Sequence, residues 1–439
     1  MKSFKILTLG CKVNQAESEA IAQCLETADL NPAPEGQAAD LCIINTCTVT
    51  QKASMQSRQA IRRAIRSNPK AKIIVTGCYA QTAPEEIKEI SGIQQIISQA
   101  DKYKLPEIIT KGAACEITGS VSDGPKRLFD SFPLPGYGKR TRPFLKVQDG
   151  CNAFCTYCIV PYARGPSRSL PLEDVLTNIR KLSEAGYREV VLAGIHLGCY
   201  GLDLSPKTNL LELLQHIRDS KTIEQIRLSS IEPQELNGNI IDFVAQSSPA
   251  PGSVCQHFHI PLKSGDDEIL KRMKRPYTGK FFRELIMKIH RVLPDAASGV
   301  DILVGFPGES EAAFDTTYAL IEALPISYLH VFPFSGRKGT PAYTFDDKIP
   351  PQVIKDRCRK MRNLGSLKKK NFYRRFLGKS LKTLIEAATD KKTGLVKGRT
   401  TNYIPVLVAG EKVPANTLVE VRIDKVADDN SVFGTVCHP

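Results

Sequence analysis

The chain has 439 residues, enough for about three domains of ordinary size. Its 60 Lys and Arg residues exceed its 46 Asp and Glu residues by 14, which favours a polyanionic partner such as nucleic acid. No run of about 18 apolar residues occurs, which excludes a membrane-spanning helix. Because the N-terminal segment also lacks the apolar stretch of a signal peptide, we expect a cytoplasmic protein with no membrane partner.

The first 118 residues alternate predicted strands and helices. The expected strands are 4–9, 41–45, 72–76 and 93–97, and the expected helices are 15–28 and 53–66. This alternation predicts βαβ units and a parallel sheet. Residues 1–118 are therefore expected to form one domain. Residues 119–142, which are rich in turn-forming residues, are expected to form a linker.

Residues 143–335 repeat the strand–helix pattern six times, within a domain expected to span residues 143–370. The expected strands are 143–148, 189–193, 225–229, 257–260, 299–304 and 328–332. The expected helices are 172–185, 210–219, 234–245, 280–293 and 311–324. Six units are two short of a closed (β/α)₈ barrel, so the pattern favours an open partial (β/α)₆ barrel, with a doubly wound sheet as the alternative.

After Gly378 the pattern changes to short alternating runs typical of strands, within a domain expected to span residues 371–439. The runs are 381–386, 395–399, 404–408, 418–423 and 432–436. Five such strands indicate a small OB-like β-barrel, a common RNA-binding module. The expected fold class is thus α/β, with a βαβ domain, a partial barrel and a small C-terminal barrel.

A strongly basic segment, 355–382, leads into this last domain, with twelve Lys and Arg residues and one acid. The charge predicts contacts with RNA phosphates, although a solvated helix face is the alternative. The candidate RNA-binding residues are Lys368, Lys369, Lys370, Arg374 and Arg375. Three neighbouring aromatic residues are expected to stack on bases: Phe372, Tyr373 and Phe376.

The chain contains thirteen cysteines, which in a reducing compartment are more often metal-binding or catalytic than bridged. Cys151, Cys155 and Cys158 follow the first strand of the middle domain in a C-x₃-C-x₂-C pattern. Three thiolates can hold an iron–sulfur cluster and leave one iron without a protein ligand. A structural zinc site is the alternative, but it normally needs a second Cys or His pair at fixed spacing, and the chain shows none.

Three other cysteines each follow the end of a predicted strand: Cys11, Cys47 and Cys78. Because the carboxyl ends of parallel strands lie along one edge of a sheet, we expect these thiols to converge. They are then candidates for a second three-thiolate cluster. The alternative is three unrelated buried cysteines.

With an aromatic residue, Tyr157, before its last cysteine, the C-x₃-C-x₂-C pattern resembles that of the radical S-adenosylmethionine (SAM) enzymes. Together, the two cysteine trios and the C-terminal barrel make nearly the whole chain similar to the methylthiotransferases. These have an N-terminal cluster domain, a radical SAM core and a TRAM domain. The detailed match is to the tRNA N6-threonylcarbamoyladenosine subfamily and extends over 9–15, 45–50, 76–81, 227–232, 259–265, 305–309 and 330–335.

The resemblance implies a function and its cofactors. Cys151, Cys155 and Cys158 would hold a 4Fe–4S cluster whose open iron binds SAM, and a second 4Fe–4S cluster would lie on the other trio. The expected product carries a methylthio group at C2 of N6-threonylcarbamoyladenosine, next to the anticodon of tRNA. Radical chemistry suits this carbon because an aromatic C–H is a poor acid. The implied partners are tRNA and a reductant or electron-donor protein.

Loops after the barrel strands are expected to contact SAM, because barrel sites lie at that face. The candidates are Tyr157, Gly194, Ser229, Glu232 and Leu262. Four histidines in or after barrel strands are interpreted as core or loop residues, since nothing pairs them with a nucleophile: His196, His257, His259 and His330.

Three alternative functions remain open from the sequence. Two keep the chemistry and change the substrate to isopentenyladenosine in tRNA or to a ribosomal-protein aspartate. The basic C-terminal segment disfavours the protein substrate, because RNA is the stronger polyanion. The third alternative is a non-catalytic RNA-binding iron–sulfur sensor.

Overall fold

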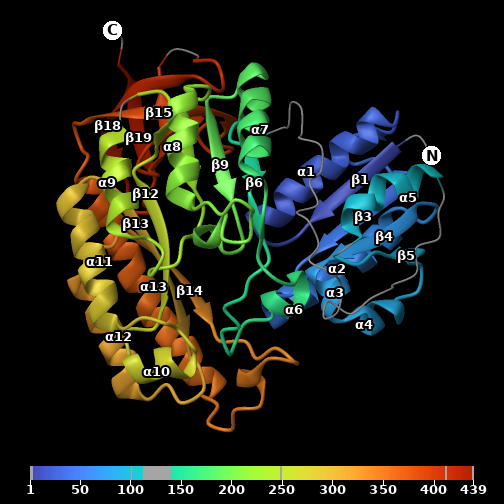
Figure 1. Ribbon diagram of the computed structural model, residues 1–439, viewed down its shortest axis with the longest axis horizontal. Helices are drawn as coiled ribbons and strands as arrows, with labels where there is room; N and C mark the ends of the chain where they lie inside the picture. Colours follow the sequence, from blue (N-terminus) through green and yellow to red (C-terminus); the bar gives the residue numbers. More distant parts are fainter. Residues whose placement is uncertain (1–2, 100, 112–139, 248–249, 411–412, 438–439) are drawn as a thin grey trace.

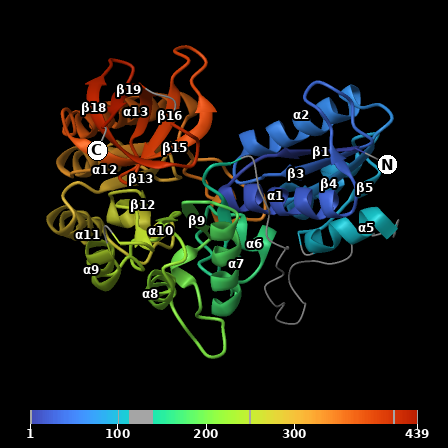
Figure 2. The ribbon, with the colours of Figure 1, turned by 90° about the horizontal axis from the view of Figure 1, so that it is seen from above.

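The computed structural model describes residues 3–99, 101–111, 140–247, 250–410 and 413–437. An N-terminal domain lies beside a central open barrel, and a small closed barrel packs against the central one (Figure 1). Figure 2 shows the same three parts from above. The expected linker, 119–142, lies almost wholly outside the described residues. No helix among the described residues is both long and apolar enough to cross a bilayer.

The N-terminal domain is a parallel sheet with the strand order β2-β1-β3-β4-β5. Its strands are β1 (Ser3–Thr8), β2 (Asn31–Pro32), β3 (Leu41–Thr46), β4 (Lys72–Gly77) and β5 (Gln95–Ile96). Its helices are α1 (Lys12–Thr27), α2 (Gln51–Ser67), α3 (Cys78–Thr82), α4 (Pro84–Lys88) and α5 (Leu105–Lys111). The predicted βαβ architecture is confirmed, while the short edge strand β2 was not predicted.

Helices cover both faces of this sheet, which explains the unbroken apolar run of its central strand β3. Leu41 and Ile43 pack against one apolar cluster with Ile21 of α1. Cys42 and Ile44 pack against another with Ile61 of α2. Because successive strand side chains point to opposite faces, a strand covered on both sides must be apolar throughout.

The central domain is an open barrel of six main parallel strands, as predicted. These are β6 (Phe144–Lys146), β9 (Glu189–Ala193), β10 (Gln225–Leu228), β12 (His257–Lys263), β13 (Ala297–Val304) and β14 (Tyr328–Pro333). A bridge between Ser230 and His259 joins the two halves of the barrel. The short β11 (Ser253–Val254) extends the barrel beside β10, and β7 (Gln148–Asp149) and β8 (Arg168–Ser169) form a separate antiparallel pair.

Helices pack around the outside of these strands and bury one large apolar core. They are α7 (Leu172–Glu184), α8 (Leu210–Ser220), α9 (Gly238–Ser247), α10 (Asp267–Arg272), α11 (Gly279–Val292) and α12 (Glu311–Ala323), whereas the short α6 (Val160–Arg164) packs against α3 of the N-terminal domain. Several of these helices begin at a side-chain cap, and the hydroxyl of Ser310 accepts a hydrogen bond from the Ala313 N–H at α12.

The C-terminal domain is a closed five-stranded barrel, again as predicted. Its strands are β15 (Ser380–Thr389), β16 (Val396–Thr400), β17 (Pro405–Ala409), β18 (Leu418–Val426) and β19 (Val432–Val436). The basic segment forms a long helix, α13 (Pro351–Arg374), so the expected domain boundary at 370/371 falls inside this helix.

The three aromatic residues at the end of α13 lie in the core of the small barrel. Phe372, Tyr373 and Phe376 are at most 6% exposed and pack with Ile385 and Ile423. The expectation that these rings stack on RNA bases is therefore wrong. They join the helix to the barrel because burying large rings is more favourable than leaving them on a charged face.

Candidate active site between the domains

The C-x₃-C-x₂-C pattern forms a closed loop between β7 and α6. The Cys151 N–H donates to the Gly165 carbonyl at 3.1 Å, and the Cys158 N–H donates to the Cys155 carbonyl at 2.9 Å. Burial raises the pKa of the Cys158 thiol to about 12, and the neighbouring Cys155 and Cys151 thiols add to that rise. The structure thus brings the three predicted sulfur ligands together.

An arginine that the sequence did not single out contacts this loop. The Arg275 guanidinium donates to the Cys155 sulfur at 3.3 Å and forms an ion pair with Glu232. It also donates to the Tyr277 hydroxyl at 2.8 Å. Tyr157 interacts with the same groups, and burial raises the pKa of its hydroxyl well above the ordinary value. Two predicted SAM contacts, Tyr157 and Glu232, therefore lie beside the thiols.

The other predicted SAM contacts divide between the strand ends and the core. The Gly194 N–H at the end of β9 donates to the Ser229 hydroxyl at the end of β10, at 3.4 Å. The Leu262 side chain is fully buried in the barrel core, and its carbonyl accepts the Tyr277 hydroxyl at 3.0 Å. Leu262 can therefore offer a ligand little beyond its backbone.

The four histidines have different surroundings. His196 lies at the thiol loop, with Nδ1 3.3 Å from the Cys151 sulfur. His257 stacks on the Tyr403 ring with centroids 4.0 Å apart, and His259 lies 2.7 Å from an Asp301 oxygen. His330 is half exposed and lies 3.4 Å from Asp301. Neighbouring side chains engage both ring nitrogens of His259, as interpreted, whereas His257 keeps a buried Nδ1 without a hydrogen-bond partner and His196 also touches a predicted ligand.

The second trio lies at the carboxyl ends of three adjacent strands, β1, β3 and β4. Cys11 is the N-cap of α1, Cys47 directly follows β3, and Cys78 begins α3. Burial raises the pKa of the Cys47 thiol to about 11, and the Cys78 and Cys11 thiols add to the rise. The sheet thus gathers three thiols that are far apart in the sequence.

Two glycines make this gathering sterically possible. A Cβ on Gly10 would lie 2.9 Å from the Cys47 Cβ and 3.0 Å from its sulfur. A Cβ on Gly77 would lie 2.5 Å from the Thr46 carbonyl oxygen. Both glycines have positive φ values, +102° and +97°, which residues with a side chain rarely adopt.

Both donor sets fit an iron–sulfur cluster better than a single ion. Two groups of described residues have all their possible ligand atoms within 4.8 Å of one another, and neither group is a cysteine trio. Each thiolate of a cubane binds a different iron, so cluster ligands lie farther apart than those of one zinc ion. Buried thiols with raised pKa values also need a nearby positive charge, such as an iron core, to ionise.

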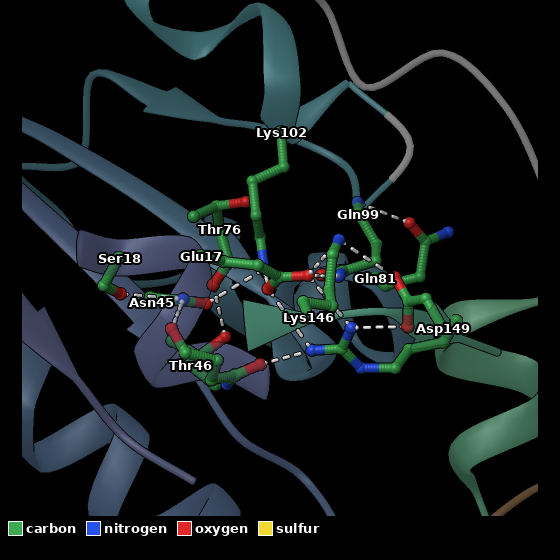
Figure 3. Close-up of polar contacts among 12 residues, drawn as sticks. Glu17, Ser18, Asn45, Thr46, Thr76, Gln81, Gln99, Lys102, Lys146 and Asp149 are labelled. Carbon is green, nitrogen blue, oxygen red and sulfur yellow. Dashed lines mark hydrogen bonds and ion pairs between the residues drawn. The ribbon is translucent and has the colours of Figure 1, made fainter. Parts of the chain in front are cut away.

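A buried ion-pair network joins the N-terminal and central domains, and Figure 3 shows its members Glu17, Lys102, Lys146 and Asp149. Glu17 of α1 accepts from Lys102 at 2.7 Å and from Arg164 at 3.1 Å, and Arg164 also pairs with Asp149 at 2.8 Å. All four side chains are at most 2% exposed. Burial alone would raise the pKa of Glu17, but the Arg164, Lys102 and Lys146 cations outweigh it and hold that pKa well below its usual value.

The network connects the radical SAM loop to the loops of the second trio. Arg164 ends α6, shortly after Cys158, and its guanidinium donates to the Asn14 side-chain oxygen. The Asn14 amide in turn donates to the carbonyls of Leu9 at 2.8 Å and Thr46 at 3.0 Å. Glu17 and Arg164 are 147 positions apart, so no local pattern in the sequence could have paired them.

The predicted RNA-binding residues lie around the end of α13, and most of them contact the protein itself. Lys368 donates to the Leu324 carbonyl at 2.7 Å, and Lys370 pairs with Asp428 at 2.6 Å. Arg375 donates to the Pro294 carbonyl at 2.7 Å. Lys369 lies over the Tyr373 ring, and Arg374 is exposed.

An open parallel barrel with a three-cysteine loop at the carboxyl ends of its strands defines a radical SAM enzyme, and residues 145–321 match the Radical SAM superfamily. Residues 3–98 match the family described as Uncharacterized protein family UPF0004. A solved radical SAM methyltransferase, TsrM from Kitasatospora setae, has a similar fold, with a TM-score of 0.55 and 15% identity. The match covers 78% of this chain and 77% of that one.

Curated relatives extend the match to nearly the full chain. Threonylcarbamoyladenosine tRNA methylthiotransferase MtaB of Bacillus subtilis (strain 168) is 39% identical over 97% of this chain and 94% of its own. The tRNA-2-methylthio-N(6)-dimethylallyladenosine synthase of Clostridium tetani (strain Massachusetts / E88) is 31% identical over 96% of this chain and 94% of its own. The chain belongs to the radical SAM methylthiotransferase family, in its threonylcarbamoyladenosine tRNA methylthiotransferase branch.

Proposed function

We propose that this enzyme transfers a methylthio group to C2 of N6-threonylcarbamoyladenosine next to the anticodon of tRNA. The observation that carries the proposal is the pair of three-thiol sites joined through the buried Arg164. A sensor needs only one cluster, whereas this transfer needs one site to activate SAM and another to handle sulfur. The full-length similarity to a relative of that name supports the choice of substrate.

In this proposal Cys151, Cys155 and Cys158 hold a 4Fe–4S cluster with an open iron for SAM, and Cys11, Cys47 and Cys78 hold the second cluster. When bound, these groups supply the radical and sulfur chemistry that side chains cannot. The role of the protein is to position them. Arg275 would fix the Cys155 sulfur and Glu232 through its hydrogen bonds, and Tyr157 would border the SAM site.

The tRNA surface in this proposal includes the end of α13 and the small barrel. Arg374 and Lys369 are the basic residues of the predicted set that no carbonyl or carboxylate engages among the described contacts. The remaining three, Lys368, Lys370 and Arg375, would serve mainly to join the helix to its neighbours. A reductant or electron-donor protein and a cytoplasmic location complete the proposal.

The decisive experiment is anaerobic turnover of the reconstituted enzyme with SAM, a reductant and two anticodon stem-loops. The stem-loops differ only at the target nucleoside, N6-threonylcarbamoyladenosine or isopentenyladenosine. Mass spectrometry should detect the methylthio product on the first RNA only. A methylthio product on the isopentenyladenosine RNA alone would favour the substrate type of the Clostridium tetani relative. If SAM releases no 5′-deoxyadenosine, the assignment to this class of enzyme is contradicted.

A further inference from the structure

The concave face of the central barrel carries polar side chains, whereas ordinary barrel interiors are packed with branched apolar residues. On β12 and β13, Phe258, Ile260 and Val300 pack into the apolar core. Since strand side chains alternate, His259 and Asp301 face the opposite, concave side. This face therefore suits a polar ligand.

Lys12 of the N-terminal domain reaches this face from directly beside Cys11. Its side chain is half-buried, and no hydrogen bond or ion pair within the described part of the chain involves its ammonium group. Its strongest electrostatic neighbours are Tyr403, Arg227 and Arg142, from the other two domains and the segment before β6. Tyr403 favours the charged ammonium, Arg227 and Arg142 repel it, and the nearby Asp301 is already paired with Lys263, so a half-buried cation without a partner indicates room for an anion.

The carboxylates at this junction are already occupied by basic partners. The pairs within 4 Å include Glu189 with Arg227 at 2.8 Å, Glu386 with Arg142 at 2.9 Å, and Asp301 with Lys263 at 3.0 Å. The Nε of Arg399, also at this junction, is buried without a hydrogen-bond partner. The Arg399 Nε does lie 3.9 Å from a Glu386 oxygen, so Lys12 is the cation at this junction that no carboxylate engages within 4 Å in the described part of the chain.

We propose that Lys12 binds the carboxylate of the threonylcarbamoyl group and makes the enzyme specific for it. This inference rests on the proposed function. If the cluster on Cys11 handles the sulfur delivered to C2, the adjacent residue lies where the N6 substituent of the same base would be. The threonylcarbamoyl group brings a carboxylate there, and an isopentenyl group brings none. A desolvated ammonium rejects a ligand that leaves it unpaired.

The test measures equilibrium binding of the holoenzyme to anticodon stem-loops at one fixed salt concentration. The RNAs are identical except at the target nucleoside, which is the free acid or its methyl ester. We expect the wild-type enzyme to prefer the acid by roughly ten- to hundredfold, as for a hydrogen bond to a charged group. Lys12→Gln should bind the acid as weakly as the ester, and Lys12→Arg should keep the preference. Lys70→Gln, an exposed lysine of the same domain, should change nothing.

Several results would overturn the inference. Equal losses on both RNAs would mean that Lys12 binds a phosphate, and unchanged binding would mean that it contacts neither. Iron and sulfide counts show whether Lys12→Gln keeps its clusters. If Lys12→Gln loses its clusters, two other results still decide against the inference. One is a wild-type affinity ratio near one between the acid and ester RNAs, and the other is the loss of that preference in Lys12→Arg. If the wild-type enzyme modifies the acid RNA but Lys12→Gln still prefers the acid to the ester, only this inference is overturned. If the wild-type enzyme is inactive on the acid RNA, the proposed function is overturned.

Discussion

Each cysteine trio brings three thiols together, but a different part of the structure does so at each site. Cys151, Cys155 and Cys158 lie in one eight-residue loop, which closes on itself through backbone hydrogen bonds. Cys11, Cys47 and Cys78 come together because three parallel strands end at one edge of a sheet. The first site depends on a short segment, and the second depends on strand register and on the packing of two domains. Damage to the tertiary structure should therefore affect the second site first.

The largest expected effect separates the two sites by chemistry. Cys151→Ala should abolish both cleavage of SAM to 5′-deoxyadenosine and formation of the methylthio product, because the first site starts the reaction. Cys47→Ala should abolish only the product and leave SAM cleavage in place. Both quantities are measured by mass spectrometry under anaerobic conditions, and Cys24→Ala, outside both trios, is the control. Loss of SAM cleavage in Cys47→Ala would contradict this division of labour.

A second prediction concerns the ion-pair network that joins the sites. Arg164→Met should lower the free energy of unfolding by about 3–5 kcal/mol, since it leaves Asp149 and Glu17 buried with fewer cations. Lys88→Met, which breaks the exposed pair with Glu85, should cost at most about 0.5 kcal/mol. Denaturant unfolding measures both. Comparable costs for the two variants would show that the network does not hold the domains together.

A third prediction concerns the close approach at Gly10. Gly10→Ala should cost about 1–3 kcal/mol and reduce the iron bound at the second site, because the new methyl group would press on Cys47. Gly36 also has a positive φ, +84°, but a Cβ there would meet nothing within 4 Å. Gly36→Ala should therefore cost only about 1 kcal/mol of backbone strain and keep full iron content. Equal iron loss in both variants would reject the steric explanation.

The smallest expected effect concerns a contact from the barrel to the loop after Cys47. Arg337 donates to the Thr48 hydroxyl at 2.6 Å and to the Ser54 hydroxyl at 2.9 Å. Arg337→Ala should cost about 1 kcal/mol, because the two hydroxyls still bond to each other at 3.0 Å. Lys338→Ala, at the exposed neighbour, is the control. Faster loss of iron from the second site in Arg337→Ala would sharpen the contrast between the sites, and identical rates would weaken it.

Patterns with a local physical cause were predictable. The strand Glu189–Ala193 was expected with the bounds that the structure has, because an apolar run between two amphipathic helices allows little else. The placement of Cys11, Cys47 and Cys78 after strands also follows from strand periodicity alone. By contrast, the aromatic residues at the end of α13 were assigned to RNA, because their sequence neighbours are basic. Only the packed barrel shows that Phe376 is fully buried.

The sequence by itself determined the three-domain order, the cysteine spacing of the radical SAM loop and the excess of positive charge, since each depends on residues close together in the chain or on composition. The tertiary structure decided which distant side chains meet: Arg164 with Glu17, and Arg275 with Cys155 and Glu232. Such pairs form because burial makes an unpartnered charge costly, and which charges are buried together is a property of the fold.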